Sequence, residues 1–180
     1  MKKIFGLFLM GVLLTVLPIF GQAEGVRGKI DVRSSAFGEG DSIPSDFTCD
    51  GADMSPPIEW SGVPANAQSL AVIVEDPDAP AGNWTHWLVY DLPPDLMQLP
   101  AGISFGEKFP VGSLQGRTDF GKPGYRGPCP PKGEHRYFFK VYALDAMLRL
   151  KSGASRQELS QVMQGHILAE GVLMGKYDRS

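Results

Sequence analysis

Glycine and proline confine the regular structure of this chain to short segments. The sequence contains 22 glycines and 15 prolines, and they gather in clusters, the longest of which runs from Gly112 to Gly133. Proline lacks an amide donor and glycine loosens the backbone, so such clusters mark turns and loops. Between them lie three runs rich in Val, Ile, Tyr, Phe and Trp: Ser69 to Glu75, Trp84 to Leu92 and Arg136 to Leu144. We therefore predict a mainly β fold.

The third run has apolar side chains on both faces. Strand alternation separates its residues into two sets, Tyr137, Phe139, Val141 and Ala143 against Phe138, Lys140 and Tyr142. A strand that is apolar on both faces lies inside a sandwich, where the stem of Lys140 can extend along apolar neighbours to reach water. The pattern indicates a β-sandwich.

One helix is predicted near the C-terminus. Ser155 and Glu158 fit a capping box, and an apolar stripe extends from Leu159 to Ile167. Gly171 is expected to end this helix, and residues 172–177 to form a final strand. The sequence therefore predicts an antiparallel β-sandwich with a C-terminal helix and a short final strand.

The first residues have the features of a signal peptide. Two lysines precede an apolar run from Ile4 to Phe20, and small residues follow it, which is the pattern that signal peptidase recognises. We expect residues 1–23 to be removed and residues 24–180 to form a single domain, periplasmic or secreted. An uncleaved anchor is the alternative, although the run is short for a membrane span of about 20 residues.

Composition limits the partners and the redox state of the chain. It has 17 basic and 20 acidic residues, and no run of Lys or Arg that could follow a phosphate backbone, so nucleic acid is a poor candidate partner. The two cysteines are Cys49 and Cys129. Thiols of an exported protein oxidise and stay oxidised, so we predict a disulfide between them, with a pair of buried reduced cysteines as the alternative.

Ionisable side chains lie in or beside the first two predicted strands. The segment Asp76-Pro77-Asp78-Ala79-Pro80 follows the first strand, and its prolines fix a turn that can point a carboxylate inward. His86 lies in the second strand, where alternation places it on the face of Leu88 and Tyr90 and partly buried. The alternatives are a solvated Asp-Pro turn and a histidine that merely fills the core.

A third cluster of polar groups opens the third strand. A proline-rich segment, residues 127–133, leads directly to His135, Arg136 and Tyr137. His135 and Tyr137 can donate hydrogen bonds, and alternation places the cation of Arg136 on the opposite face from both. In the alternative reading Arg136 pairs with a local carboxylate and His135 only caps the strand.

Several separated motifs carry a resemblance to a known family. They are Ser55-Pro56-Pro57-Ile58-Glu59-Trp60, Asp76-Pro77-Asp78-Ala79-Pro80, Trp84-Thr85-His86-Trp87, Pro130-Pro131-Lys132-Gly133 with His135-Arg136-Tyr137, and Gly165-His166-Ile167-Leu168-Ala169-Glu170. With these motifs in this order, the chain resembles the phosphatidylethanolamine-binding protein family, specifically its bacterial Raf kinase inhibitor-like branch. The resemblance spans nearly all of residues 24–180.

The resemblance implies a surface pocket that accepts phosphate-like anions and phospholipid head groups, without catalysis or a cofactor. Its lining would include Asp76, Pro80, His86, His135 and Tyr137. The histidines and the tyrosine supply the donors that a phosphate needs. Asp76 would repel a bare phosphate unless it is protonated, orients a histidine or receives the ammonium of an ethanolamine-type ligand, and the last option favours a zwitterion.

Other classes of function stay open. An interaction or inhibitor module acting on an envelope or host protein could use the loop from Phe109 to Gly133. A metal-dependent hydrolase could use Asp76 and Asp78 with the two strand histidines, but no HExxH or His-x-His occurs, and we expect no metal. A nucleophilic hydrolase is disfavoured because Gly112-Ser113-Leu114-Gln115-Gly116 has its serine in the second position rather than the third.

Overall fold

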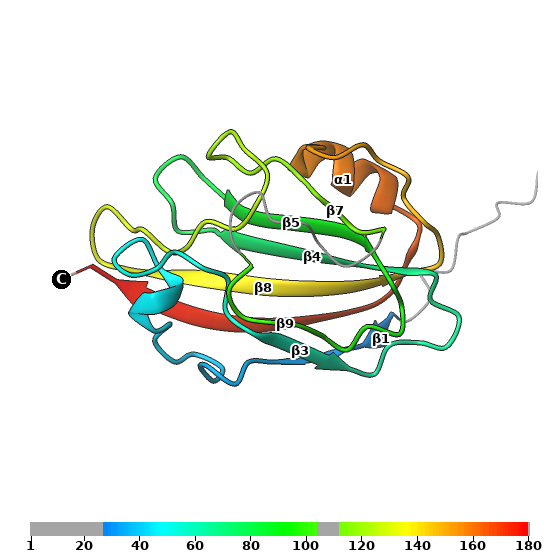
Figure 1. Ribbon diagram of the computed structural model, residues 1–180, viewed down its shortest axis with the longest axis horizontal. Coiled ribbons are helices and arrows are strands. Elements are labelled where there is room, and N and C mark those ends of the chain that lie inside the picture. Colours follow the sequence, from blue (N-terminus) through cyan, green and yellow to red (C-terminus); the bar gives the residue numbers. More distant parts are fainter. Residues whose placement is uncertain (1–26, 104–111, 180) are drawn as a thin grey trace, which may run out of the picture.

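The structure is a computed structural model that describes residues 27–103 and 112–179; the predicted leader, residues 1–23, lies outside them. The elements, in chain order, are β1 (Gly28–Lys29), β2 (Asp31–Arg33), the 3-10 helix η1 (Ser45–Phe47), β3 (Ile58–Ser61), β4 (Ser69–Asp76), β5 (Trp84–Leu92), β6 (Gln98–Leu99), β7 (Leu114–Gln115), β8 (Glu134–Leu144), α1 (Arg156–Met163) and β9 (Ile167–Asp178). Figure 1 shows the long strands β5, β4, β8 and β9 side by side. The predicted mainly β fold is confirmed.

The strands form two sheets that face each other across an apolar core. The larger sheet has the order β1-β9-β8-β4-β5-β7 and the smaller has the order β2-β3-β6. The core between them includes Val32, Ile58, Trp60 and Leu99 of the small sheet and Leu70, Val72, Val74, Trp87, Val89, Tyr137, Phe139 and Val141 of the large one, all buried. Pairing is antiparallel except between β1 and β9, which run parallel. Burial of this apolar surface holds the sandwich together.

Helix α1 covers part of the other face of the large sheet. Leu159 and Met163 of the helix pack with the strand residues Ile73, Leu88 and Tyr90 in a second apolar cluster. The predicted capping box is present: the Ser155 hydroxyl accepts from the Glu158 amide, and the Glu158 carboxylate accepts from the Ser155 amide. No helix among the described residues is long and apolar enough to cross a membrane.

The predicted end of the helix was wrong. The helix stops at Met163, and the backbone turns at Gly165, where φ is +85°. Ile167 then begins β9 and pairs with Leu144, so neither Ile167 nor His166 belongs to the helix. The final strand has 12 residues and includes Gly171, so it is longer than the short strand predicted over residues 172–177. Residues 167–170 form a strand because they pair with β8, although the apolar periodicity predicted that the helix would include them.

A buried carboxylate ties α1 to the sheet. Glu75 is 1% exposed and accepts hydrogen bonds from Lys140 Nζ (2.6 Å) and from Arg156 Nε (2.5 Å). The Lys140 side chain, predicted to reach for water, is 31% exposed and its ammonium binds this carboxylate. Burial opposes ionisation of Glu75, but hydrogen bonds and charges from the two cations outweigh it and lower the pKa of Glu75.

The predicted disulfide is present. Cys49 and Cys129 are joined, with Cα atoms 5.4 Å apart and a separation of 80 positions in the sequence. Beside the bond, the Cys49 amide donates to the Pro128 carbonyl (3.1 Å). The cross-link therefore holds the loop before β8 against the segment that follows η1.

Candidate functional site

The candidate site lies where two strands of the large sheet end. Asp76 is the last residue of β4 and continues the core-facing row of Val72 and Val74, while His135 and Tyr137 stand near the start of β8 in the row of Phe139. Because β4 and β8 are antiparallel neighbours, the end of one row meets the beginning of the other. Polar side chains thus close one end of an otherwise apolar core.

A β-bulge turns His86 toward this end. Between β4 and β5, Val74 pairs with Trp87 but Glu75 pairs with Thr85, so His86 is an extra residue on β5. Bulges of this kind redirect side chains. The prediction that His86 lies on the face of Leu88 was therefore wrong. Its ring lies on the opposite face, that of the core between the sheets, and packs edge-on against Tyr137 with ring centroids 5.2 Å apart. The predicted partial burial is exceeded, since His86 is 3% exposed.

The pocket formed here has a volume of about 280 Å³. It is lined by Asp76, Ala79, Pro80, Ala81, Trp84, His86, Phe120, Cys129, Pro131, His135 and Tyr137. All five residues predicted as ligand-binding are brought together. The sequence interpretation missed the aromatic rim residues Trp84 and Phe120; an aromatic residue within the glycine-rich stretch 112–133 was the available signal for Phe120. A pocket of this size suits a small ligand or one group of a larger ligand.

Asp76 and His135 form a buried pair. His135 Nδ1 lies 2.8 Å from Asp76 Oδ2, and the other carboxylate oxygen accepts from the Asp78 amide (2.8 Å). A carboxylate only accepts hydrogen bonds, so His135 donates from Nδ1. The second nitrogen, Nε2, has no hydrogen-bond partner among the described residues and keeps some contact with solvent. Asp76 therefore orients a histidine, one of the three roles considered for it.

His86 is oriented by a backbone carbonyl. Its Nδ1 lies 2.7 Å from the Arg126 oxygen, and since a carbonyl only accepts, Nδ1 carries the proton. Burial lowers the pKa of His86 below its ordinary value, although the hydrogen bond to Arg126 and the charge of Asp76 act in the opposite direction. A neutral His86 in this orientation presents the lone pair of Nε2 to the pocket.

The hydroxyl of Tyr137 is buried without a partner. It is the one side-chain polar atom of residues 27–103 and 112–179 that is closed to solvent and makes no hydrogen bond. Burial, together with the neighbouring Asp76 carboxylate, raises the pKa of Tyr137 far above its ordinary value, so the hydroxyl stays protonated. Leaving a buried polar group unpaired costs about 1–3 kcal/mol, which a bound ligand can recover.

Asp78 and Arg136 lie outside the pocket. Arg136 makes two side-chain hydrogen bonds to the Asp78 carboxylate (2.8 and 2.7 Å) and donates its amide to it (3.0 Å). These bonds lower the pKa of Asp78 to about 2. The alternative reading of Arg136 as the partner of a local carboxylate is correct. Asp78 is thereby occupied, and the described part of the chain contains no group of three or more metal-binding side chains suitably placed for an ion.

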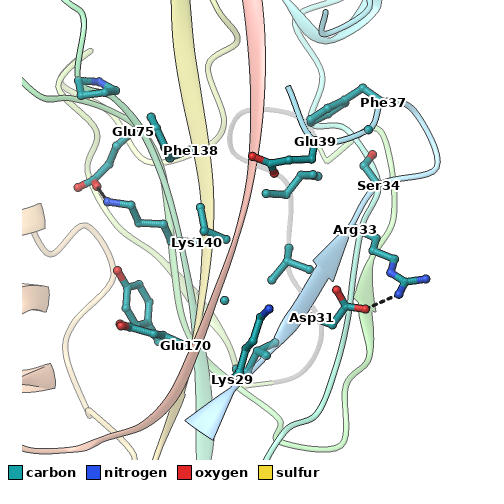
Figure 2. Close-up of a pocket in the computed structure, with 18 of the residues that line it drawn as sticks. Lys29, Asp31, Arg33, Ser34, Phe37, Glu39, Glu75, Phe138, Lys140 and Glu170 are labelled. Atoms are coloured by element: carbon teal, nitrogen blue, oxygen red, sulfur yellow. Dashed lines mark hydrogen bonds and ion pairs between the residues drawn. The ribbon is translucent and has the colours of Figure 1, made fainter. Parts of the chain in front are cut away.

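A larger groove of about 1090 Å³ lies elsewhere, along β2, β8 and β9. Figure 2 shows Glu75 and Lys140 on one side of it and Asp31 and Arg33 on the other. These charged side chains pair among themselves, with Arg33 Nη2 2.6 Å from the Asp31 carboxylate and Lys140 bound to Glu75. None of the five predicted ligand-binding residues lines this groove. The smaller pocket, with its unpartnered polar atoms, is therefore the better candidate for the site.

Fold and pocket together define the class of protein, a β-sandwich with a small histidine-lined pocket at one end of its core. The chain belongs to the phosphatidylethanolamine-binding protein family, whose family model matches residues 33–178. This confirms the resemblance found in the motifs.

Several relatives and solved structures are similar to this chain over most of its length. A UPF0098 protein of Methanothermobacter thermautotrophicus is 49% identical over 150 residues, which cover 83% of this chain and 99% of that protein. Among solved structures, a putative phosphatidylethanolamine-binding protein homolog from Chlamydia trachomatis, CT736, is 40% identical, with a TM-score of 0.78 and coverage of 84% of this chain and 99% of that one. E. coli YbcL, described as a new member of the mammalian family, is 34% identical, with the same TM-score and coverage.

Proposed function

We propose that this protein is an exported small-ligand-binding protein whose pocket takes a phosphate-like anion or a phospholipid head group of the phosphoethanolamine type, without turnover. The observation that carries the proposal is the unpartnered, buried hydroxyl of Tyr137 beside the open Nε2 atoms of His86 and His135. Three polar atoms that converge on one small space, each lacking a partner among the described residues, are suited to a polar group brought by a ligand.

The charges of the pocket favour a zwitterion over a bare anion. Asp76 offers acceptor oxygens, whereas Tyr137 and a protonated His86 offer donors. A phosphate needs the donors and an ammonium needs the acceptors. Phosphoethanolamine carries both groups, so it can use both halves of the lining.

The rim favours a ligand whose polar head continues into an apolar body. Ala79, Pro80, Ala81, Trp84, Phe120 and Pro131 surround the polar floor. Trp84 and Phe120 meet edge-on with ring centroids 5.7 Å apart. Such an apolar border can bury part of a lipid's glycerol or acyl portion while the head group occupies the floor.

Export rests on the leader pattern and on the disulfide, because a stable cross-link suits an oxidising compartment. Fractionation of cells, followed by N-terminal sequencing of the protein, tests this half of the proposal. We expect a periplasmic or secreted protein that begins at Glu24.

NMR titration with phosphoethanolamine and with phosphate tests the ligand. We expect saturable shifts of the His86 and His135 ring signals, larger for phosphoethanolamine, while exposed His166, paired with Asp145, stays unchanged as an internal control. His135→Ala should weaken binding by about 1–2 kcal/mol, the cost of a lost hydrogen bond to a charged group. Shifts confined to His166, with an intact fold, would contradict the proposal. Hydrolysis of a phosphate or ester substrate that His86→Ala abolishes would contradict the absence of turnover.

A second candidate is an interaction or inhibitor module acting on an envelope or host protein. Phe120, from the loop named for this role, is 42% exposed at the rim of the pocket; residues 109–111 of that loop lie outside the described residues. Pull-down from an envelope extract with wild type and Phe120→Ser distinguishes the candidates. A partner lost only in Phe120→Ser, without a change in phosphoethanolamine affinity, would favour the module.

A further inference from the structure

The carbonyl that orients His86 is itself held by a carboxylate outside the pocket. Asp53 Oδ1 accepts from the Gly127 amide (2.6 Å), and Asp53 Oδ2 accepts from Arg126 Nη1 (2.7 Å). The Gly127 N–H and the Arg126 C=O belong to one planar peptide group and point in opposite directions. Holding the N–H toward Asp53 therefore aims the C=O at His86. The Arg126 amide in turn donates to the His86 carbonyl (3.0 Å), which fixes the loop to β5.

The backbone at both ends of this contact, at Asp53 and at Gly127, has unusual features. Asp53 has φ +54°, a conformation that non-glycine residues rarely adopt. At Gly127 a Cβ atom would overlap the Phe47 carbonyl and the backbone of Thr48, so only glycine allows the loop to approach so closely. The carboxylate that binds the Arg126–Gly127 peptide thus comes from a residue in an uncommon conformation, and the peptide itself includes a glycine that no larger residue could replace without a clash.

We infer that Asp53 is a positioning residue for the ligand site: through the Arg126–Gly127 peptide it keeps the proton of neutral His86 on Nδ1, so that an anion enters the pocket only together with a proton. The binding half of this inference rests on the proposed function. With Nδ1–H held by the carbonyl, Nε2 of the neutral ring is an acceptor and repels an anionic oxygen. Protonation of Nε2 converts it into a charged donor for that oxygen.

The groups that face His86 determine how readily it takes up this proton. Asp76 on β4 and Asp53 behind the loop favour the imidazolium, whereas burial, the largest influence, opposes it. Tyr137 on β8 packs edge-on against its ring, His135 lines the same pocket, and Arg126 contacts it through the backbone. An anion in the pocket adds a negative charge beside the ring, which favours protonation. Binding and proton uptake are therefore linked.

The tautomer of His86 in the ligand-free protein tests the positioning role directly. Ring ¹⁵N spectra distinguish Nδ1–H from Nε2–H, and we expect Nδ1–H for His86 in the wild type at pH 8. Asp53→Gly removes the carboxylate while accommodating the positive φ, and it should populate the Nε2–H form. Asp53→Asn keeps an acceptor oxygen for Gly127 and should largely restore Nδ1–H. Asp145→Asn is the matched control, since it removes a carboxylate that contacts His166 (2.7 Å) and should alter only the His166 signals.

Sulfate affinity as a function of pH tests the proton linkage, because sulfate does not itself titrate near neutrality. Because the Nε2 of neutral His135 is likewise an acceptor that faces the pocket, the measurement is made in a His135→Gln background. In this protein we expect affinity to fall about tenfold for each unit of pH above the pKa of His86 in the free protein, as uptake of one proton requires. Asp53→Gly should reduce this slope to about threefold or less, since an Nε2–H ring can donate without protonation. Calorimetry in buffers of different ionisation enthalpy should show uptake of about one proton in the His135→Gln protein and less when Asp53→Gly is added.

An Nε2–H tautomer in the ligand-free wild type would overturn the inference. So would an unchanged tautomer and an unchanged pH slope in Asp53→Gly with the fold intact; if that variant does not fold, the wild-type tautomer and Asp53→Asn provide the test. Absence of binding to both sulfate and phosphoethanolamine in the wild type would instead overturn the proposed function and, with it, the proton linkage. The tautomer measurements need no ligand and would still support or overturn the role of Asp53.

Discussion

Replacing both Cys49 and Cys129 with alanine should reveal how strongly the disulfide stabilises the fold. The bond joins residues 80 positions apart, and the chain-entropy relation for a closed loop of that length predicts a stabilisation of about 4.5 kcal/mol at 25 °C. The change acts mainly on the unfolded chain. The hydrogen bond from the Cys49 amide to the Pro128 carbonyl and that from the Tyr125 hydroxyl to the Phe47 carbonyl do not involve the sulfur atoms, so the native loops keep these contacts.

Urea unfolding followed by tryptophan fluorescence measures this effect. With a slope of roughly 2 kcal/mol per M, the midpoint should fall by roughly 2 M, and the slope should rise because the unfolded chain without the cross-link exposes more surface. Wild type in a reducing agent should match the double-alanine variant, which itself should not respond to the agent. A difference of less than about 1 kcal/mol between oxidised wild type and the variant, at unchanged slope, would refute the argument from loop closure.

Three further predictions concern buried polar groups. Glu75→Gln should lower the free energy of unfolding by roughly 3 kcal/mol, because it leaves Lys140 and Arg156 without their shared carboxylate; a loss below about 1 kcal/mol in urea would show that water screens the cations. Tyr137→Phe should leave ligand-free stability unchanged or higher but weaken phosphoethanolamine binding by on the order of 1 kcal/mol by calorimetry, since the hydroxyl has no partner among the described residues; lowered stability would reveal a hidden structural bond. Because burial lowers the pKa of His86, the unfolded state binds a proton at this ring more readily than the folded state, so the free energy of unfolding should fall as pH drops below about 6.5. Urea titrations from pH 8 to 5 should show a smaller fall in His86→Gln than in the wild type. Equal falls in the two proteins would contradict a lowered pKa of His86.

The site residues that could be predicted are those that lie in recognisable local sequence motifs. Asp76, His86, His135 and Tyr137 lie in dense local motifs with strand patterns around them, so both their chemistry and their family resemblance were readable. Asp53 carries no such signal. It acts through a peptide 73 to 74 residues further along the chain, and only folding brings the two together.

Local patterns in the sequence determined the strands and the start of the helix. The bounds of β5 match the predicted run from Trp84 to Leu92, and Ser155 caps α1 as its spacing with Glu158 predicts. The core-facing row of β8 also follows the alternation of Tyr137, Phe139 and Val141. These features depend on neighbours within a few residues, which the periodicity of strands and the chemistry of caps make visible.

Only the tertiary structure decided which groups meet at the pocket and how they are oriented. The bulge opposite Val74 and Glu75 moved His86 to the side of Tyr137, although simple alternation placed it with Leu88. Pairing with β8 converted Ile167 from a helical position into the first residue of β9. Register shifts and pairings between distant segments depend on the balance of packing and hydrogen bonds over the whole sheet, which no short stretch of sequence contains.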